Sequence, residues 1–390
     1  MEQALKAERI QNILDTTNFI EPKKVPVGIE FITWPFAYAG VTYREVMHDP
    51  KRAAECYVKF LDNIELDWVW GAPGVPFPIE SFHSLGIKSY EIAIDDTCIQ
   101  HQQVYTQYME AEEYDNYIKD PKGFQKNVFI RRTASAFSLP RDEAYAALKD
   151  AAQKYKPLRD MNNLIRETVF NQKQIVSLTG PGSPMYYAPF DTLFDHMRGI
   201  KNALTDIRRR PDKVKEACDA IWAQTKPLIN PDNYKDKPFL FGRTFYHSAC
   251  FISPKQFDEL IFSYFLDGYG ELIENGLKFY LKGEGQFLKL LDRYRQFPKG
   301  SMVIMLDEDD PFEAYKIIGD WQTVATGIRT DLMQYGTKQQ CVDYVKKCFD
   351  TFAPGGGFMF TLNKPLIAAN DVKIDNLIAV YQTANELSRK

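Results

Sequence analysis

Short apolar runs alternate with longer amphipathic segments along most of the chain. The apolar runs cover residues 25–32, 65–72, 174–180, 238–245, 277–283, 301–308, 323–329 and 356–363. Most of them are apolar nearly throughout, which is typical of parallel strands that are buried on both faces. Helical spacing is found at 47–63, 141–169, 188–227, 253–275, 286–295, 311–318, 337–352 and 371–389, with a break expected at Pro211.

Eight strands that alternate with helices predict an α/β fold of the (β/α)8 TIM-barrel type. The segment 73–140 does not fit a bare barrel, and we interpret it as an insertion after the second strand that lies over the barrel mouth. It contains a strand-like run at 88–94 and a helical stretch near 107–120. The alternative is a doubly wound open sheet, but no GxGxxG motif follows the first strand. Since no linker divides the chain, we expect a single domain over 1–390.

Composition excludes several classes of protein. The chain has 48 Lys and Arg against 52 Asp and Glu, and this net charge of -4 argues against a nucleic-acid partner, which would require a basic excess. No stretch approaches the roughly 20 apolar residues that span a bilayer. The six Cys are scattered and predict free thiols in a reducing compartment, so we expect a cytoplasmic protein. The 27 Phe, 22 Tyr and 5 Trp exceed what we expect of core filling alone and indicate a flat apolar pocket.

In a barrel, functional side chains lie at the carboxyl ends of the strands. Those positions carry Glu30, Trp34, Trp70, Arg243, Tyr246, His247, Cys250, Lys282, Glu284, Asp307, Glu308, Asp309, Arg329, Asn363 and Lys364. Arg243, Lys282, Glu284 and Asp307 could instead form a structural ring of ion pairs. His247 and Cys250 resemble a metal-binding HxxC pair, but no second pair lies nearby. His83 and His196 are interpreted as packing residues.

Several phrases together resemble the uroporphyrinogen decarboxylase superfamily. They are VPVGIEF (25–31), FDTLFDHMRGIKNALTDIRRRPDKVKEACDAI (190–221), ISPKQFDELIFSYF (252–265) and LMQYGTKQQCVDYVKKCFDTFAPGGGFMFTLNKPL (332–366). The resemblance covers most of the chain from about residue 24 and implies a (β/α)8 barrel. The superfamily contains true decarboxylases and corrinoid-dependent methyltransferases.

Two branches of that superfamily fit poorly. True decarboxylases carry an Arg-bearing motif after the first strand that grips substrate carboxylates, whereas the equivalent stretch here is FITWPFAYAG (31–40). Thiol methyltransferases hold zinc with an H-x-C-G motif and a later Cys. Here the two positions read Lys282-Gly283-Glu284-Gly285 and Gly355-Gly356-Gly357, so all three zinc ligands are absent.

The chain is more similar to the methyltransferase I components of anaerobic aryl methyl ether O-demethylases. A zinc pattern E-x14-E-x20-H is associated with some of them, and Glu65, Glu80 and His101 have that spacing. The predicted strands place Glu65 at the amino end of the second strand and Glu80 beyond its carboxyl end, roughly 20 Å away at about 3.3 Å per residue. Glu284 and Asp307 are the alternative place for a metal.

The resemblance implies methyl transfer from an aryl methyl ether of the veratrole, guaiacol or vanillate type to Co(I) of a corrinoid on a separate protein. The expected catalytic residues are Glu284, Lys282, Asp307, His247 and Tyr246. The expected substrate-binding residues are Trp34, Phe36, Trp70, Arg243, Phe245, Tyr280 and Arg329. The alternatives are another methyl donor, a decarboxylase or a non-catalytic binding protein. The cofactors are the partner's corrinoid and, as an option, zinc, and a homodimer is compatible with the chain.

Overall fold

Two parallel sheets form the centre of the protein. The computed structural model describes residues 2–102, 107–180, 182–234 and 240–389. One sheet has the order β1-β2-β5 and the other β11-β10-β9-β8-β7-β6, while β3 and β4 form an antiparallel pair. The strands are β1 (Gly28–Ile29), β2 (Trp68–Val69), β3 (Tyr90–Ile92), β4 (Ile99–His101), β5 (Val176–Ser177), β6 (Met185–Tyr186), β7 (Gly242–Phe245), β8 (Phe279–Gly283), β9 (Met302–Leu306), β10 (Thr323–Thr326) and β11 (Phe358–Phe360).

All eight predicted apolar runs contain one of these parallel strands, and residues 238–239 of the fourth run lie outside the described residues. The larger sheet adjoins both edges of the smaller sheet. Val27, just before β1, forms a parallel bridge with Phe360 of β11. At the other edge the backbone N–H of Phe241 donates to the carbonyl oxygen of Leu178 at 3.0 Å.

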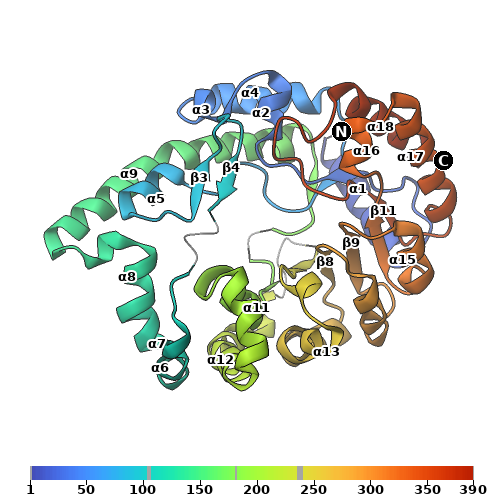
Figure 1. The fold of residues 1–390 in the computed structure, drawn as a ribbon. Helices are drawn as coiled ribbons and strands as arrows, with labels where there is room; N and C mark the ends of the chain where they lie inside the picture. Colours follow the sequence, from blue (N-terminus) through green and yellow to red (C-terminus); the bar gives the residue numbers. More distant parts are fainter. Residues whose placement is uncertain (1, 103–106, 181, 235–239, 390) are drawn as a thin grey trace.

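Helices surround the sheets (Figure 1). The α-helices are α1 (Glu2–Thr17), α2 (Trp34–Ala39), α3 (Tyr43–Val46), α4 (Pro50–Leu61), α5 (Ile79–Leu85), α6 (Tyr114–Lys119), α7 (Pro121–Phe124), α8 (Ile130–Thr133), α9 (Arg141–Arg166), α10 (Pro189–Asp191), α11 (Ile200–Arg209), α12 (Pro211–Thr225), α13 (Pro254–Phe257), α14 (Ser263–Glu274), α15 (Pro311–Ile318), α16 (Thr330–Tyr335), α17 (Lys338–Phe352) and α18 (Ile374–Ser388). The predicted break at Pro211 separates α11 from α12.

The alternation of side chains along the strands separates an inner core from an outer one. In β8, Phe279 and Leu281 pack among the residues of the surrounding helices, whereas Tyr280 belongs to the inner cluster. This follows from the two-residue period of a strand. The inner cluster joins both sheets with α1, and it comprises Ile13, Trp68, Val176, Leu178, Phe241, Tyr280, Val303, Met305, Ala325 and Met359.

Capping side chains mark the start of two of the helices. Ser253 precedes α13, and its side chain accepts a hydrogen bond from the backbone of Gln256, which reciprocates. Thr337 and Gln340 form the same capping box before α17. In each box two backbone donors that a helix leaves unsatisfied find partners.

The segment 73–140 contains α5, the β3–β4 pair and α6 to α8. These elements lie on one side of the molecule, with α5 and the β3–β4 pair beside the long helix α9, and with α6 and α7 lower down, near α12 (Figure 1). The predicted strand at 88–94 is present as β3. Within the described part of the chain, no helix combines the length and apolar character needed to cross a bilayer.

A substitution at Gly28 tests how tightly the sheets pack. A Cβ atom there would lie 2.2 Å from ring atoms of Trp68, which is 1% exposed. Because overpacking a closed core costs about 1–3 kcal/mol, we expect Gly28→Ala to lower the midpoint of thermal unfolding by several degrees. Differential scanning calorimetry measures this change.

Gly270 provides the matched control, because it lies inside α14 and a Cβ atom added there would meet no neighbouring atom within 4 Å. Gly270→Ala is expected to hold or raise the midpoint, since Ala stabilises a helix interior by about 1 kcal/mol relative to Gly. Equal midpoints for the two variants would contradict the packing at Trp68.

Candidate active site

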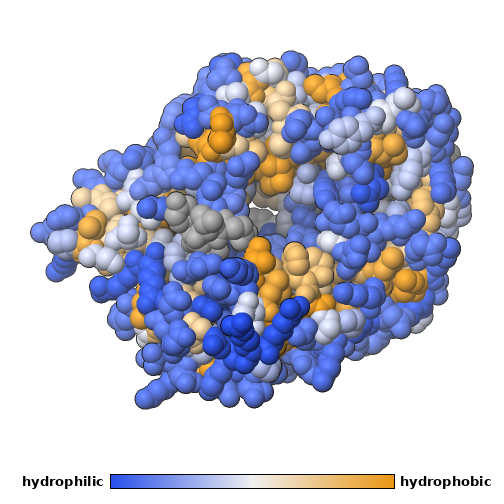
Figure 2. Space-filling model, in the orientation of Figure 1, coloured by the Kyte–Doolittle hydropathy of each residue, from blue (hydrophilic) through white to orange (hydrophobic). Residues whose placement is uncertain are grey.

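A cavity of about 580 Å³ lies at the carboxyl ends of β2, β6, β7 and β8. Its lining is largely aromatic and comprises Trp70, Phe77, Tyr90, His101, Met185, Tyr187, Phe194, Asp195, His196, Ile200, Phe245, His247, Phe251, Lys282 and Glu284. The space-filling view shows a hollow at the centre of the ring of helices, with hydrophobic residues on its rim (Figure 2). The protein therefore has a recess at the edge of the sheets where parallel strands end.

The imidazole of His247 lies between two carboxylates at this cavity. Its Nδ1 is 2.5 Å from Oδ2 of Asp195, and its Nε2 is 3.5 Å from Oε2 of Glu284. Burial opposes the charged imidazole, but the hydrogen bond to Asp195 and the negative charge of Glu284 outweigh it and raise the pKa of His247 to about 9. At neutral pH His247 therefore favours the cationic form, which donates from Nδ1 to Asp195 and forms an ion pair with Glu284 through Nε2.

Asp195 also accepts a hydrogen bond from the hydroxyl of Tyr187. The same hydroxyl is 3.2 Å from Nε2 of His196. Burial lowers the pKa of His196 and of His101, so these two imidazoles favour the neutral form. The lining of the cavity thus combines one charged and two neutral imidazoles.

Lys282 and Glu284 bring further charge to the cavity from the end of β8. Lys282 is 8% exposed, and its Nζ is 2.7 Å from Oε2 of Glu30 and 4.7 Å from the centre of the Trp70 ring. Burial raises the pKa of Glu284, opposed by the positive charges of His247 and Lys282. A raised pKa favours the protonated form of a carboxyl group, and in that form it can give its proton to a bound molecule.

Aromatic rings form flat walls around these charges. Phe77 stacks on Tyr90 with ring centres 3.9 Å apart, and Tyr90 stacks on His101 at 4.7 Å. On the other side Phe245 stacks on His247 at 5.0 Å and meets Trp70 edge-on at 6.3 Å. Such rings offer both faces and edges to a planar aromatic ligand.

Five of the residues predicted from strand ends line this cavity: Trp70, Phe245, His247, Lys282 and Glu284. Tyr280 is 2% exposed in the inner cluster, with its ring centre 6.5 Å from that of Trp70. It supports Trp70 and does not line the cavity.

Trp34 and Phe36 are not at the cavity, contrary to the sequence-based expectation. Both lie in the short helix α2 and are at most 1% exposed. Trp34 packs edge-on against Phe60, and Phe36 packs against Tyr57, which places both rings in the core between α2 and α4. The chain turns into a helix after β1, and this turn carries the rings away from the strand ends.

Tyr246 is also misplaced by the sequence analysis. It follows Phe245 directly and therefore faces the opposite side of the strand, where it is fully buried between Phe257 and Phe287. Arg329 forms an ion pair with Asp331 at 3.0 Å and does not line the cavity.

Asp307 and Arg243 lie close to the cavity without lining it. Asp307 accepts from the backbone N–H of Gly285 at 3.1 Å and is 3.7 Å from Nζ of Lys364, while burial raises its pKa. The guanidinium of Arg243 lies 5.8 Å from the centre of the Trp70 ring and lines a different cavity.

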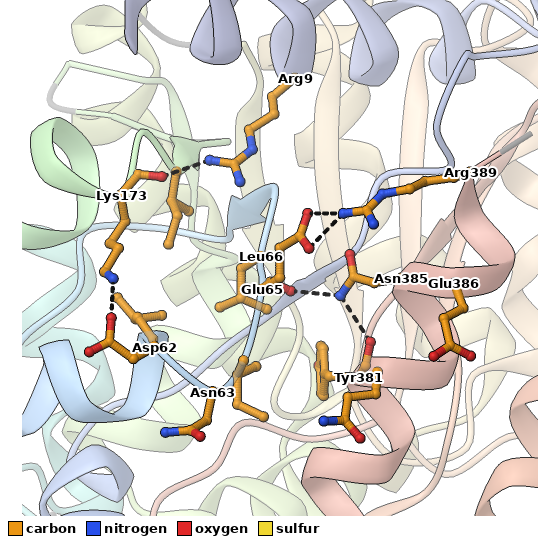
Figure 3. Close-up of a pocket in the computed structure, with 14 residues that line it drawn as sticks. Arg9, Asp62, Asn63, Glu65, Leu66, Lys173, Tyr381, Asn385, Glu386 and Arg389 are labelled. Atoms are coloured by element: carbon orange, nitrogen blue, oxygen red, sulfur yellow. Dashed lines mark hydrogen bonds and ion pairs between the residues drawn. The ribbon is translucent and has the colours of Figure 1, made fainter. Parts of the chain in front are cut away.

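The structure does not bring Glu65, Glu80 and His101 together. Glu65 lies in a separate pocket of about 370 Å³, where it pairs with Arg389 at 2.7 Å (Figure 3). It also pairs with Lys24 at 3.1 Å. Glu80 is 3.3 Å from His48, and His101 stacks on Tyr90. Among the described residues, no three His, Cys, Asp or Glu side chains are grouped to hold a metal ion. The donor set does not fit zinc.

Sequence reasoning missed Asp195 and Tyr187 and interpreted His196 as a packing residue. Asp195 and His196 lie in a turn of helix (Thr192–Met197) that follows α10, a few residues after their partner Tyr187. The signal was present in the phrase FDTLFDHM, which combines two acids and a His with aromatic residues. Its chemical meaning depends on His247, 52 residues further along the chain.

The chain is similar in fold to a protein of known structure. No family model matches the chain, and no curated protein matches its sequence. Among solved structures, a methyltransferase from Methanosarcina mazei is similar over 98% of both chains, with a TM-score of 0.57 and 12% identity. The chain therefore shares the overall fold of that methyltransferase.

The protonation of His247 can be measured directly. The chain has five His, so their imidazole signals can be followed by NMR titration. We expect His247 to titrate near pH 9, well above the ordinary value of about 6.5. Asp195→Asn should lower that pKa by at least about one unit, because it removes the charge that holds the proton.

The pH dependence of stability follows from the same raised pKa. The Asp195–His247 pair contributes fully to the free energy of unfolding below about pH 6.5. This contribution is lost as the pH rises through about 9. For the NMR titration, Glu91→Gln is the control. It removes a carboxylate that pairs with a different imidazole, that of His83 at 2.9 Å, and should leave the titration of His247 unchanged. An unchanged His247 titration in Asp195→Asn would contradict the assigned pair.

Proposed function

We propose that this protein is a methyltransferase that moves a methyl group from an aryl methyl ether to the Co(I) of a corrinoid carried by a separate protein. The observation that carries the proposal is the position of Glu284, a half-buried carboxyl group in the wall of an aromatic cavity at the strand ends, where burial raises its pKa. The similarity in fold to a methyltransferase supports the reaction class.

We also propose that the two parallel sheets are arcs of one (β/α)8 barrel. The Val27–Phe360 bridge and the hydrogen bond from Phe241 to Leu178 support this, because they connect the sheets at both edges. The shared inner cluster supports it as well. In such a barrel the cavity occupies the usual position of an active site.

The charges of the cavity favour a neutral aromatic donor. Lys282 and cationic His247 would repel a methylammonium donor. A tetracarboxylate would require several cations, and Lys282 is the only Lys or Arg in the described lining. The stacked rings of Phe77 and Tyr90 and the ring of Phe245 suit a flat phenyl ether.

In the proposed reaction the methyl carbon–oxygen bond breaks, a carbon–cobalt bond forms, and the phenol leaves. The corrinoid supplies a two-electron nucleophile, Co(I), which becomes Co(III). Phenolate is a poor leaving group, so Glu284 donates its proton to the ether oxygen as the bond breaks. Cationic His247, 3.5 Å from Glu284, stabilises the Glu284 carboxylate that remains, and solvent then returns a proton to it.

The partner must reach the cavity closely, because reacting atoms have to approach within about 3–3.5 Å. We propose that the corrinoid protein docks over the hollow, whose hydrophobic rim suits such a contact (Figure 2). Lys282 is held by Glu30 and steadies Trp70, so the aromatic wall keeps its position during docking.

The proposal is tested by methyl transfer from veratrole, guaiacol or vanillate to a reduced corrinoid protein, followed through the absorbance change of cobalt. Glu284→Gln is expected to slow the reaction by about 10²-fold or more, because general acid catalysis contributes about 10²- to 10⁴-fold. The apparent KM for the ether should change little, because the amide retains the shape of the carboxyl group.

Glu313→Gln is the matched control, because Glu313 pairs with Lys316 on the outer helix α15 and should retain full activity. Absence of transfer from every aryl ether with an active corrinoid partner would refute the function. Full activity in Glu284→Gln would refute only the role of Glu284.

A further inference from the structure

A second cavity, of about 750 Å³, lies beside the seam between β5 and β7. Three cationic side chains line it: Lys6 from α1, Arg166 from the end of α9, and Arg243 from β7. The described residues of its lining include no Asp or Glu. This is unusual in a protein with a net charge of -4, because cations that face a cavity are normally balanced by nearby acids.

Arg243 is the central feature of this cavity. It is partly buried, its Nε is buried without a hydrogen-bond partner, and it forms no ion pair with any described residue. Burial lowers its pKa, which reflects the cost of placing a charge there without compensation. Its cationic group lies 5.8 Å from the ring centre of Trp70, a contact that satisfies none of its N–H donors.

Two other buried arginines in the protein show the usual arrangement. Arg9 is 7% exposed and lies 3.2 Å from the carboxylate of Asp67. Arg198 is 4% exposed and lies 2.7 Å from Asp206. A buried guanidinium is costly unless an acid faces it. Arg243 therefore differs from both in lacking an internal counter-charge.

One hydroxyl group adds a free neutral donor to the same cavity, because the Oγ of Ser183 is buried without a partner. Ser177 and Thr179 also line the cavity, but their hydroxyls donate to the backbone carbonyls of Thr179 and Trp70. Arg166 is exposed and Lys6 is partly exposed, so positive charge continues from the surface towards Arg243. Charge of one sign along a recess attracts and concentrates the oppositely charged ligand.

We propose that this cavity binds a multivalent oxyanion, a phosphate or polycarboxylate group whose charged head pairs with the guanidinium of Arg243. The planar fork of Arg243 suits the paired oxygens of such a group. Arg166 and Lys6 draw the anion in, and Ser183 donates its free hydroxyl. The volume is larger than a single phosphate requires, so the natural ligand is an organic molecule that carries the oxyanion. The site is independent of methyl transfer.

Isothermal titration calorimetry tests the proposal by measuring the binding of pyrophosphate and, separately, of citrate to the full-length protein. The titrations are made at constant ionic strength and without corrinoid or ether. We expect saturable binding of at least one probe and an affinity at least about tenfold lower in Arg243→Gln, since a charge-assisted contact is lost. The probe that binds more tightly identifies the head group as phosphate or carboxylate. Arg243→Lys keeps the positive charge but not the planar guanidinium. Its affinity for the probe should lie between that of the wild type and that of Arg243→Gln.

Arg131→Gln is the matched control, because Arg131 is an exposed arginine on α8 and does not line the cavity. Arg166→Gln tests the outer part of the cavity. Because Arg166 is exposed, this variant should fold normally, and it is expected to weaken binding of the probe severalfold. The bound probe should also raise the thermal midpoint of the wild type and leave that of Arg243→Gln unchanged. Lack of binding to both probes, or equal affinity in wild type and Arg243→Gln, would overturn the proposal.

Discussion

The ion pair between Lys282 and Glu30 joins the two parallel sheets where their strands end. Lys282 comes from β8 of the larger sheet, and Glu30 directly follows β1 of the smaller one. Because Lys282 is almost fully buried, losing the partner would leave an uncompensated charge at a cost of about 3–5 kcal/mol. This pair also holds Nζ of Lys282 over the Trp70 ring. The side chain of Lys282 therefore both joins the two sheets and supports an aromatic wall of the cavity.

The other charges of the cavity depend on the same edge. Glu284 lies two residues after Lys282 and meets His247 from the end of β7, while Asp195 holds the far nitrogen of that imidazole. Each group alters the protonation of its neighbour, since positive charges oppose the effect of burial on Glu284 and negative charges overcome it on His247. The cavity therefore contains an acid and a cation whose proton affinities are set by neighbours and not by residue type alone.

Periodicity explains both the successes and one of the errors of prediction at the strand ends. Phe245 and His247 are two residues apart and face the same cavity, as the period of a strand requires. Tyr246 lies between them and must face the opposite side, so its burial was already implied by the sequence. Trp34 and Phe36 are different, because only the turn of α2 against α4 shows where those rings point.

The amino-acid sequence was enough to predict eight of the nine parallel strands, all except β6, together with most of the helices and five residues of the cavity wall, because hydrophobic period and strand ends are local properties. Contacts between distant segments set the rest. They placed Asp195 beside His247 across 52 residues, and they gave Glu65 the partners Arg389 and Lys24. Spacing along a chain measures contour length and not distance in space. The pattern that joins Glu65, Glu80 and His101 could therefore match a metal motif in sequence while its members lie apart in the fold.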